Sequence, residues 1–256
     1  PVLEKVCRWH GCLGGTIRTH RRNPHQRQLV TETRLFGKTP PDFFTVQEHG
    51  LQYEISLTKT QHTGLFLDQR DTRRRIHLLA EGKRLANLFA YTCSFSVAAV
   101  SGGAEVAFSV DLSKPGLNTG KNNFVLNDLA DGGRGKFIQE DVRSWIDRQL
   151  RRQDEKPKQW QPLDLVVCDP PVFASSKKGG KFSVETEWAR LAEATHRLMA
   201  PGGQAVFANN HRTGDHAVYL KDLESRFSEV QDLRPPLDFP VAEGRPHHVR
   251  IFWCLK

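Results

Sequence analysis

The sequence predicts a doubly wound α/β fold: a mostly parallel sheet of about seven strands with helices on both faces, preceded by a small N-terminal β extension. Three observations lead to this prediction. Short apolar runs of strand length alternate with segments of helix length along most of the chain. Residues 84–111 form a strand-helix-strand unit, and residues 43–57 alternate apolar and polar side chains around a glycine-containing turn.

The N-terminal part is organised around a β-hairpin. FFTVQ and LQYEISL alternate apolar and polar residues on either side of residues 48–50, which is typical of a hairpin over about residues 43–57. Before it, Thr16–Arg22 is predicted as a short strand that leads into a turn at Asn23 and Pro24. We therefore expect an N-terminal extension at residues 1–60 and a main domain at residues 61–256.

The main domain is expected to begin with a turn and a strongly basic helix over residues 61–75. Asp68 is a candidate N-cap of this helix. Cations in the first turns of a helix oppose its dipole, so their stabilising partner is expected outside the helix. A ligand carboxylate or nucleic-acid phosphates would serve. The basic residues are Arg70, Arg73, Arg74 and Arg75.

The unit at residues 84–111 fixes the fold class. Its two apolar strands suit a sheet that is buried on both faces, and Gly102 and Gly103 separate the helix from the second strand. Asp111 stands at the end of that strand, where a carboxylate can accept hydrogen bonds from the hydroxyls of a ribose. The segments are a strand at Arg84–Tyr91, a helix at Ser94–Val100 and a strand at Ala104–Val110.

The alternation continues to the end of the chain, which gives the remaining strands and helices of the predicted sheet. The expected strands are residues 136–139, 163–168, 204–208, 229–233 and 248–255, and the expected helices are residues 114–126, 142–152, 185–199 and 216–227.

Composition narrows the class of protein. The 256 residues carry a formal charge of +8, which favours a polyanionic partner. No apolar run approaches the roughly 18 residues of a membrane span, and no signal peptide opens the chain. Because the chain starts at Pro1 and not at Met, we expect it to be a fragment that lacks a further N-terminal domain.

The cysteines indicate a reducing compartment, so we expect a cytoplasmic protein. Five cysteines are scattered without a CxxC pair, which does not suit a disulfide framework. Cys7, His10 and Cys12 lack a fourth ligand at recognisable spacing, and we expect no metal site there.

Polar residues follow four of the predicted strands: Tyr91 with Thr92, then Asp111, Asp141 and Asp169. An aspartate after a strand is often only a helix N-cap. In an open parallel sheet, however, the carboxyl ends of the strands face one crevice. We therefore expect these residues to converge on one site.

These segments carry a family resemblance. The series LFAYT, SVDLS, KNNFVLND, CDPPVFASSK and FANNHR, preceded by TGLFLDQR, resembles the S-adenosylmethionine-dependent methyltransferases of large-subunit (23S) rRNA. It is most similar to the guanine-N7 methyltransferase half of a bifunctional bacterial enzyme, and next to its cytosine-C5 relatives. The resemblance covers about residue 16 to the C-terminus. It implies a Rossmann-like methyltransferase sheet and S-adenosyl-L-methionine as the cofactor.

The resemblance also implies roles for individual residues. Asp111 would hold the ribose hydroxyls, Asp141 would face the adenine amino group, and Arg70 would meet the methionine carboxylate. The catalytic floor for the target base would be formed by Asp169, Pro170, Pro171 and Phe173. The cofactor-binding residues would be Phe66, Asp68, Gln69, Arg70, Asn87, Ala90, Tyr91, Thr92, Asp111, Leu112, Ser113, Asn123, Asp141, Val142 and Asp169.

One residue departs from the family pattern. The position of Cys93 is normally glycine, because the backbone there passes close to the cofactor and can need a positive φ. A side chain at positive φ costs roughly 1 kcal/mol. A catalytically weakened relative that still binds RNA is therefore an alternative.

The positions of the cysteines indicate which atom of the target base receives the methyl group. Methylation of C5 of a pyrimidine needs a cysteine thiolate that adds to C6, whereas guanine N7 attacks the methyl group directly. No cysteine stands directly after the turn Asp169-Pro170-Pro171, the next strand ends in Asn209, Asn210 and His211, and Cys168 is expected in the core. Guanine N7 is therefore favoured and cytosine C5 is the alternative.

Basic residues are expected to contact rRNA phosphates. Residues 177–181 contain two glycines and are predicted to be a mobile loop that orders on RNA. Two other classes stay open: a small-molecule methyltransferase, and an RNA-binding module without activity. The expected phosphate-binding residues are Arg21, Arg22, Arg73, Arg74, Lys177 and Lys178.

Overall fold

The computed structural model describes residues 2–22, 29–60, 62–176, 180–211, 214–239 and 249–256. By its packing, the chain divides into two compact units. The first unit comprises residues 1–46 and 54–65, and the second comprises residues 47–53 and 66–256. Among the described residues, no helix combines the length and apolar character that crossing a membrane requires.

The first unit contains a helix, α1 (Val2–Trp9), and a two-stranded antiparallel ribbon. The ribbon pairs β1 (Gly14–Arg22) with β2 (Leu29–Gly37), and Gly37 at its base has a φ of +70°. The strand predicted over residues 16–22 is thus confirmed, whereas α1 and β2 were not predicted. The predicted turn at residues 23 and 24 lies outside the described residues.

The predicted hairpin is formed by β3 (Phe44–Glu48) and β4 (Leu51–Ile55). His49 and Gly50 at its turn have φ values of 50° and 83°, and positive φ at both central residues matches the twist of a two-residue hairpin turn. The tip of this hairpin, residues 47–53, packs with the second unit.

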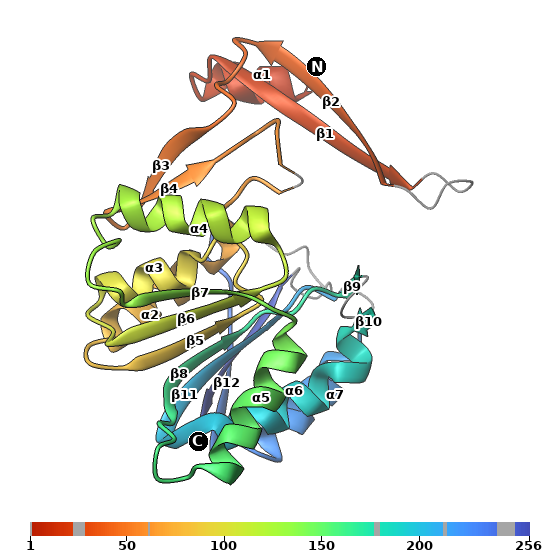
Figure 1. Ribbon diagram of the computed structural model, residues 1–256. Helices are drawn as coiled ribbons and strands as arrows, with labels where there is room; N and C mark the ends of the chain where they lie inside the picture. Colours follow the sequence, from red (N-terminus) through yellow and green to blue (C-terminus); the bar gives the residue numbers. More distant parts are fainter. Residues whose placement is uncertain (1, 23–28, 61, 177–179, 212–213, 240–248) are drawn as a thin grey trace. The chain divides into compact units, whose positions relative to one another are not determined.

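The second unit is built on a seven-stranded sheet with the order β12-β13-β11-β8-β5-β6-β7 (Figure 1). All neighbouring pairs are parallel except those of β13, which runs antiparallel to both β11 and β12. This confirms the predicted fold class. The strands are β5 (Arg84–Leu88), β6 (Val106–Asp111), β7 (Gly135–Gln139), β8 (Leu163–Cys168), β11 (Met199–Asn209), β12 (Glu229–Leu233) and β13 (Arg250–Leu255).

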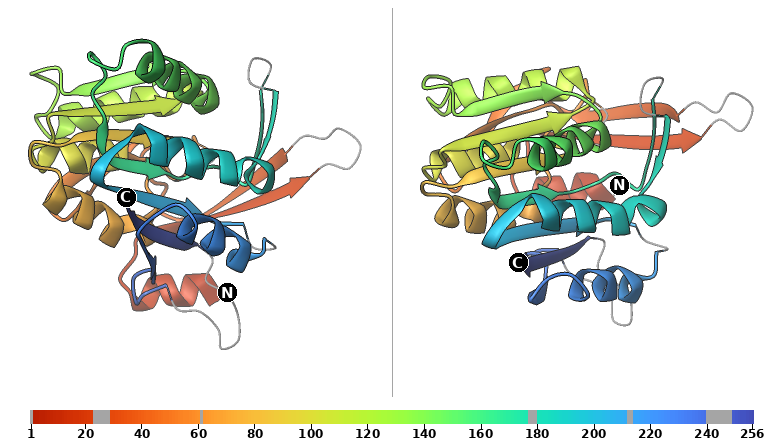
Figure 2. Two further views of the ribbon diagram at one scale, coloured as in Figure 1. Left: turned by 90° about the horizontal axis from the view of Figure 1, so that it is seen from below. Right: turned by 60° about the horizontal axis from the view of Figure 1, so that its bottom comes forward.

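Helices cover both faces of the sheet. Figures 1 and 2 show α2, α3 and α4 on one face and α5, α6 and α7 on the other. The chain reverses its direction of winding between β5 and β8, which are neighbours in the sheet. Such a switch point opens a crevice at the carboxyl ends of the strands. The helices are α2 (Arg70–Leu79), α3 (Ser94–Ser101), α4 (Lys114–Leu126), α5 (Val142–Glu155), α6 (Val184–Leu198) and α7 (His216–Glu224).

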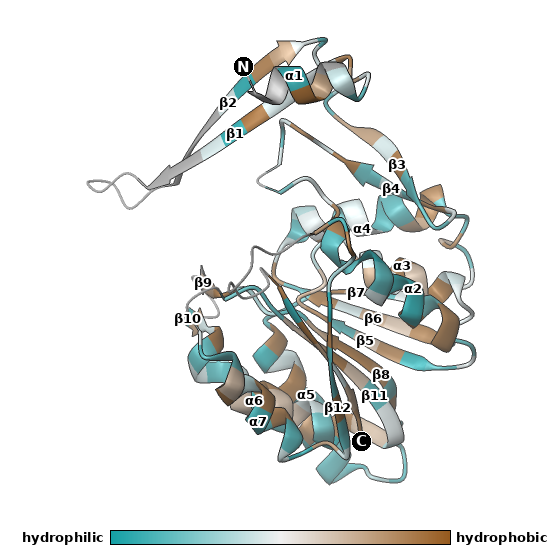
Figure 3. Cartoon of the chain, turned by 180° about the vertical axis from the view of Figure 1, so that it is seen from behind, coloured by the Kyte–Doolittle hydropathy of each residue, from teal (hydrophilic) through white to brown (hydrophobic). Residues whose placement is uncertain are grey.

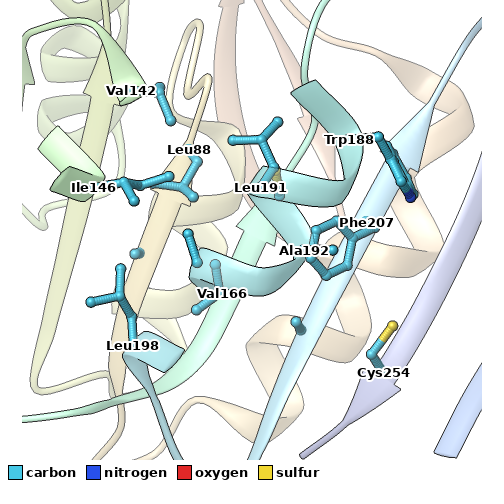
Figure 4. Packing of buried hydrophobic residues seen from close by; sticks show 14 of the residues in the cluster. Leu88, Val142, Ile146, Val166, Trp188, Leu191, Ala192, Leu198, Phe207 and Cys254 are labelled. Carbon is cyan, nitrogen blue, oxygen red and sulfur yellow. The ribbon is translucent and has the colours of Figure 1, made fainter. Parts of the chain in front are cut away.

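The largest core cluster lies between the sheet and α5, α6 and α7 (Figure 4). Trp188 and Leu191 of α6 pack against Phe207 of β11, and all three are at most 2% exposed. Figure 3 shows hydrophobic residues gathered along the central strands. Burial of each large apolar side chain contributes about 1.5–3 kcal/mol, so this packing holds the strand ends in fixed register.

Two local predictions were wrong. Asp68 does not cap α2: it lies in a short 3₁₀ helix (Leu67–Gln69), and Gln69 occupies the N-cap position without a side-chain hydrogen bond. The predicted mobile loop at residues 177–181 is wrong at its end, because Gly180 and Lys181 belong to β10 (Gly180–Ser183), which pairs antiparallel with β9 (Phe173–Ser176); residues 177–179 lie outside the described residues. Four-residue strands are too short to give a clear alternating pattern in the sequence.

Candidate functional site

The predicted polar residues lie at one edge of the sheet. Because β5, β6, β7 and β8 are parallel, Tyr91, Asp111, Asp141 and Asp169 all follow strand ends on the same side. A hydrogen bond joins two of these strand ends directly, since the Tyr91 N–H donates to Asp111 Oδ2 over 2.8 Å. The structure therefore places these residues at the edge of the sheet where the sequence predicts them, and it joins Tyr91 to Asp111 directly.

The loop after β5 has an unusual backbone. Phe89, Tyr91 and Cys93 have φ values of 60°, 48° and 60°, although none of them is glycine. Such conformations store strain and persist only where the surroundings hold them. Here the buried Asn123 of α4 donates from Nδ2 to the Thr92 carbonyl over 3.0 Å. The loop therefore keeps a fixed shape against α4.

Cys93 adopts the left-handed backbone that the family pattern predicts for glycine. Its side chain is fully buried and packs with Ala90 and Leu117, beneath the loop. Gly120 of α4 makes this possible, because a Cβ there would lie 2.9 Å from the Cys93 Cβ. Burial raises the pKa of the Cys93 thiol to about 12. The thiol therefore neither fills the crevice nor serves as a nucleophile.

Asp111 is held by the backbone and is not a helix cap. Its Oδ2 accepts from Tyr91 N, its Oδ1 accepts from Ser113 N over 2.7 Å, and Ser113 itself caps α4. Burial raises the pKa of Asp111, and the two backbone hydrogen bonds act against that rise. Each carboxylate oxygen has a second lone pair, so the group can still accept hydrogen bonds from a diol. Leu112 beside it is 40% exposed.

Asp141 caps α5 and also pairs with Arg143. Its Oδ1 accepts from the Arg143 N–H over 2.8 Å, and Oδ2 lies 2.9 Å from Arg143 Nη2. Burial acts to raise the pKa of Asp141, but the hydrogen bonds and charge of Arg143 outweigh it and lower the pKa. Asp141 is therefore ionised at neutral pH. The adjacent Val142 is buried in the core.

Asp169 is the carboxyl group at this edge of the sheet whose pKa is shifted most. Burial and the nearby charge of Asp68 raise the pKa of Asp169 to about 7, against the opposing charge of Arg73. Burial also raises the pKa of Asp68, whose Oδ1 is buried and has no hydrogen-bond partner among the described residues. Two carboxyl groups thus share a poorly solvated region at the switch point.

Beyond Asp169 the chain is stiffened by Pro170, which is buried, and Pro171, which is exposed. Phe173 follows with 58% of its surface exposed. Phe66 in the segment before α2 is 43% exposed, and its ring centroid lies 5.7 Å from that of Tyr91. These exposed rings offer flat apolar surfaces for a nucleoside.

The basic residues of α2 have separate partners, and the assignment of Arg73 to RNA was wrong. Arg73 is 2% exposed and forms two 2.7 Å hydrogen bonds with Glu48, so it cannot reach a phosphate. Arg70 pairs with Asp238 in a two-pronged ion pair. Arg75 stacks on the ring of Trp253 at 3.8 Å from the centroid. Arg74 is exposed.

Several predicted residues support the site from within the core. Asn87 is 1% exposed and donates to Ser96 Oγ, and Gln69 is 3% exposed. Lys177 and Lys178 lie outside the described residues, as do the side chains of Arg21 and Arg22.

Sequence reasoning missed Arg143, Glu48 and Asp238. Only Arg143 carried a local signal, because it stands two residues after a strand-end aspartate. The other two pair with arginines 25 and 168 residues away, and no pattern in the sequence indicates such contacts. Among the described residues, no cluster of histidine, cysteine and acidic side chains could hold a metal ion.

A model of a protein family described as S-adenosylmethionine-dependent methyltransferase matches residues 14–242. The chain belongs to this family. The crystal structure of SMU.776 complexed with SAH superposes on the whole of this chain with a TM-score of 0.82. The match spans 65% of the SMU.776 chain, and the sequences are 26% identical. The crystal structure of a methyltransferase from Agrobacterium tumefaciens matches 98% of this chain and 79% of the Agrobacterium chain, with a TM-score of 0.77. The sequences are 18% identical, so this likeness supports the fold alone.

Two curated relatives have names that specify a substrate. Ribosomal RNA large subunit methyltransferase K/L of Shewanella sp. (strain MR-4) is 35% identical over 210 residues, which is 81% of this chain and 28% of the relative. Ribosomal RNA large subunit methyltransferase K of Neisseria meningitidis serogroup B is 35% identical over 233 residues, 91% of this chain and 62% of the relative. The methyltransferase thus spans under two thirds of either relative.

The residues at this edge of the sheet fit S-adenosylmethionine by their chemistry. Asp111 would meet the ribose with a carboxylate that the backbone already orients, and the Oδ1 of Asp68, which has no hydrogen-bond partner among the described residues, would accept from the ammonium group of the methionine moiety. Gly116 lets α4 approach the loop, because a Cβ there would lie 2.9 Å from the Tyr91 carbonyl oxygen. The cofactor supplies a methyl group activated by a cationic sulfur.

Proposed function

We propose that this methyltransferase transfers a methyl group to a base of large-subunit (23S) rRNA, at N7 of guanine. The names of the Shewanella and Neisseria relatives support the substrate class. The choice of guanine N7 depends on the chemistry available at the crevice.

One observation carries that choice: the second unit offers no accessible thiol among its described residues. Cys93, Cys168 and Cys254 are each 0% exposed, and burial raises the pKa of each thiol. Methylation of cytosine C5 needs a thiolate nucleophile, so these cysteines cannot perform it. Guanine N7 has a lone pair that attacks the methyl group without covalent help.

The chain's own residues then have to position the base and stabilise charge. Guanine becomes cationic when N7 is methylated. Positive charge therefore develops on the base while the sulfur loses the methyl group and its positive charge. The ionised form of Asp169, which is populated as the pH rises past its pKa of about 7, would stabilise that charge, and the effect is large in a poorly solvated environment. No proton has to be removed from N7, and no residue is assigned as a general base.

A flipped guanine would rest on the segment from Asp169 to Phe173. The exposed ring of Phe173 is available to stack on the base, and the prolines between these residues limit the movement of the floor. Holding N7 in line with the methyl group supplies most of the catalysis that such a reaction needs.

The RNA itself would be held through phosphates. Arg74 and Lys181 are exposed in the second unit, and the chain carries a formal charge of +8. We expect RNA affinity to fall steeply with rising salt concentration, as phosphate binding by cations requires.

The test is methylation of protein-free 23S rRNA by the purified chain with a labelled methyl donor, followed by mass spectrometry of the nucleosides. The proposal predicts labelled 7-methylguanosine. Labelled 5-methylcytidine would overturn the assignment of the atom. Labelling of a small molecule, with none of the RNA, would overturn the substrate class.

A further inference from the structure

Arg143 contacts three different parts of the second unit. It lies in the first turn of α5, where the helix dipole disfavours a cation, so tertiary contacts have to offset that cost. Its Nε and Nη2 donate to Asp141 over 3.1 and 2.9 Å. Its Nη1 lies 3.3 Å from the Lys181 carbonyl and 3.4 Å from Glu187 Oε1. The side chain is only 17% exposed.

The Lys181 carbonyl belongs to the hairpin that carries the proposed base-stacking ring. Ser183 at the end of β10 lies directly across from Phe173 at the start of β9. The Val184 N–H closes the base of the hairpin by donating to the Val172 carbonyl over 3.1 Å. Figure 2 shows the hairpin projecting beside the first turn of α6. A group that fixes Lys181 therefore fixes the strand opposite Phe173.

Phe182 connects the same hairpin to the loop after β5. Its ring is 5% exposed, and its centroid lies 5.5 Å from that of Phe89. Phe89 is the first of the loop residues with a left-handed backbone. The guanidinium carbon of Arg143 lies 5.7 Å from the centroid of the Phe182 ring, so Arg143 and Phe89 both contact this ring.

We propose that Arg143 is a positioning residue that couples cofactor binding to RNA binding, by linking Asp141 to the β9–β10 hairpin. The proposal rests on the proposed function. The Asp141 carboxylate already holds the planar guanidinium through two hydrogen bonds, and a cofactor whose adenine end binds Asp141 would restrain both groups further. The same group then fixes Lys181 and Phe182. Such coupling is reciprocal: each ligand tightens the other by the same factor.

A neighbouring ion pair, between Glu140 and Arg148, provides a matched control. Glu140 directly precedes Asp141, and it pairs with Arg148 of α5. Arg148 has no hydrogen bond to the hairpin among the residues that the structure describes. Removing Arg148 thus removes a similar ion pair from α5 but leaves the link to the hairpin intact.

The experiment measures binding and not turnover. Calorimetry gives the affinity for S-adenosylhomocysteine, and titration with transcribed 23S rRNA gives the RNA affinity with and without saturating S-adenosylhomocysteine. In the wild type we expect each ligand to tighten the other about fivefold. In Arg143→Gln the factor should fall to about 1, with weaker binding of S-adenosylhomocysteine.

Two further variants separate positioning from general stability. Arg143→Lys should still pair with Asp141 and keep the affinity for S-adenosylhomocysteine, but it should lose the coupling because a lysine cannot bridge three partners. Phe182→Leu should lose coupling with little change in that affinity. Arg148→Gln should behave as the wild type. Melting temperatures establish that each variant is folded, and the lysine and leucine variants carry the test if Arg143→Gln does not fold.

The outcomes are distinct. A wild-type factor of 1, or unchanged coupling in the folded variants, would overturn the role of Arg143 while the methyltransferase assignment stands. A wild type that binds S-adenosylhomocysteine but no RNA would overturn the proposed function, and the coupling with it.

Discussion

Cys93 shows how a single residue can depart from the family pattern without closing the site. The backbone keeps the left-handed conformation, and the missing Cβ of Gly120 accommodates the added side chain. The side chain that Cys93 adds is therefore accommodated inside the core and not at the edge of the sheet where the predicted site residues lie. This makes the two positions energetically dependent on each other.

Gly120→Ala should destabilise the protein by about 1–3 kcal/mol, because the new methyl group would overlap with Cys93. In a Cys93→Gly background the same change should be neutral or stabilising, since alanine is the better helix former. Urea unfolding of the four proteins of the cycle measures the coupling. Equal effects of Gly120→Ala in both backgrounds would show that the two residues do not compete for space.

Asp169 should make stability depend on pH. Its pKa of about 7 in the folded chain exceeds the ordinary value of 3.8, so the folded state binds the proton more tightly. Stability from this group is present below about pH 4 and is lost as the pH rises to about 7. As the pH rises over that range, the free energy of unfolding of Asp169→Asn should therefore increase relative to that of the wild type. The increase should be about 1.4 kcal/mol for each unit by which the pKa of Asp169 differs between the folded and unfolded chain.

Melting temperatures of wild type and Asp169→Asn between pH 4 and pH 8 measure this difference. It should widen up to about pH 7 and then stay constant. A difference independent of pH would mean that Asp169 titrates as an exposed carboxyl group does. Methyl transfer should change in the opposite direction, because the ionised carboxylate is the form that stabilises a cationic base.

At the scale of elements, α2 shows why a cluster of arginines in the sequence did not identify the residues that bind RNA phosphates. Four arginines lie on one short helix, yet one is buried against Glu48, one pairs with Asp238 and one stacks on Trp253. Only tertiary structure separates these roles. The exposed Arg74 and the buried Arg73 are adjacent in the sequence, which makes them a matched pair for experiment.

Arg73→Ala should destabilise the protein by about 3–5 kcal/mol, because it leaves Glu48 buried without a partner. Arg74→Ala should change stability by less than about 0.5 kcal/mol and should weaken RNA binding. Urea unfolding and RNA titration at two salt concentrations measure both effects. Loss of RNA affinity in a folded Arg73→Ala variant, with none in Arg74→Ala, would reverse these assignments.

Local patterns predicted most of the elements. The bounds of α4, β8 and β12 are those predicted, because each has a clear apolar period and a distinct start or end. The hairpin β9–β10 and the strand β2 escaped prediction because their pairing joins short or polar segments. In the candidate site, the ends of parallel strands correctly placed Asp111, Asp141 and Asp169 at one edge of the sheet, whereas the partners of Arg70 and Arg73 depend on contacts between distant segments.

At the scale of the whole molecule, the doubly wound sheet separates two tasks. Asp111 and Asp141 follow β6 and β7, on one side of the switch point. Asp169 and the β9–β10 hairpin follow β8, on the other side. A cofactor and a base can therefore meet above β5 and β8, each held by residues of its own half. Substitutions in one half should then affect one ligand much more than the other.

Asp111→Ala tests this separation. At a concentration of 100 times its Kd, S-adenosylhomocysteine should stabilise the wild type by about 2.7 kcal/mol. Asp111→Ala should lose most of that stabilisation at the same concentration. The Tyr91 N–H in the loop after β5 loses the carboxylate that accepts its hydrogen bond, and the ribose loses its proposed carboxylate partner.

The RNA affinity of Asp111→Ala without S-adenosylhomocysteine should stay within about twofold of the wild-type value, since Asp111 contacts no proposed phosphate site. Thermal unfolding and RNA titration measure the two quantities, with Arg74→Ala as the reciprocal control. An undiminished thermal shift in Asp111→Ala would place the cofactor elsewhere on the sheet, and equal losses for both ligands would mean that the two halves act as one site.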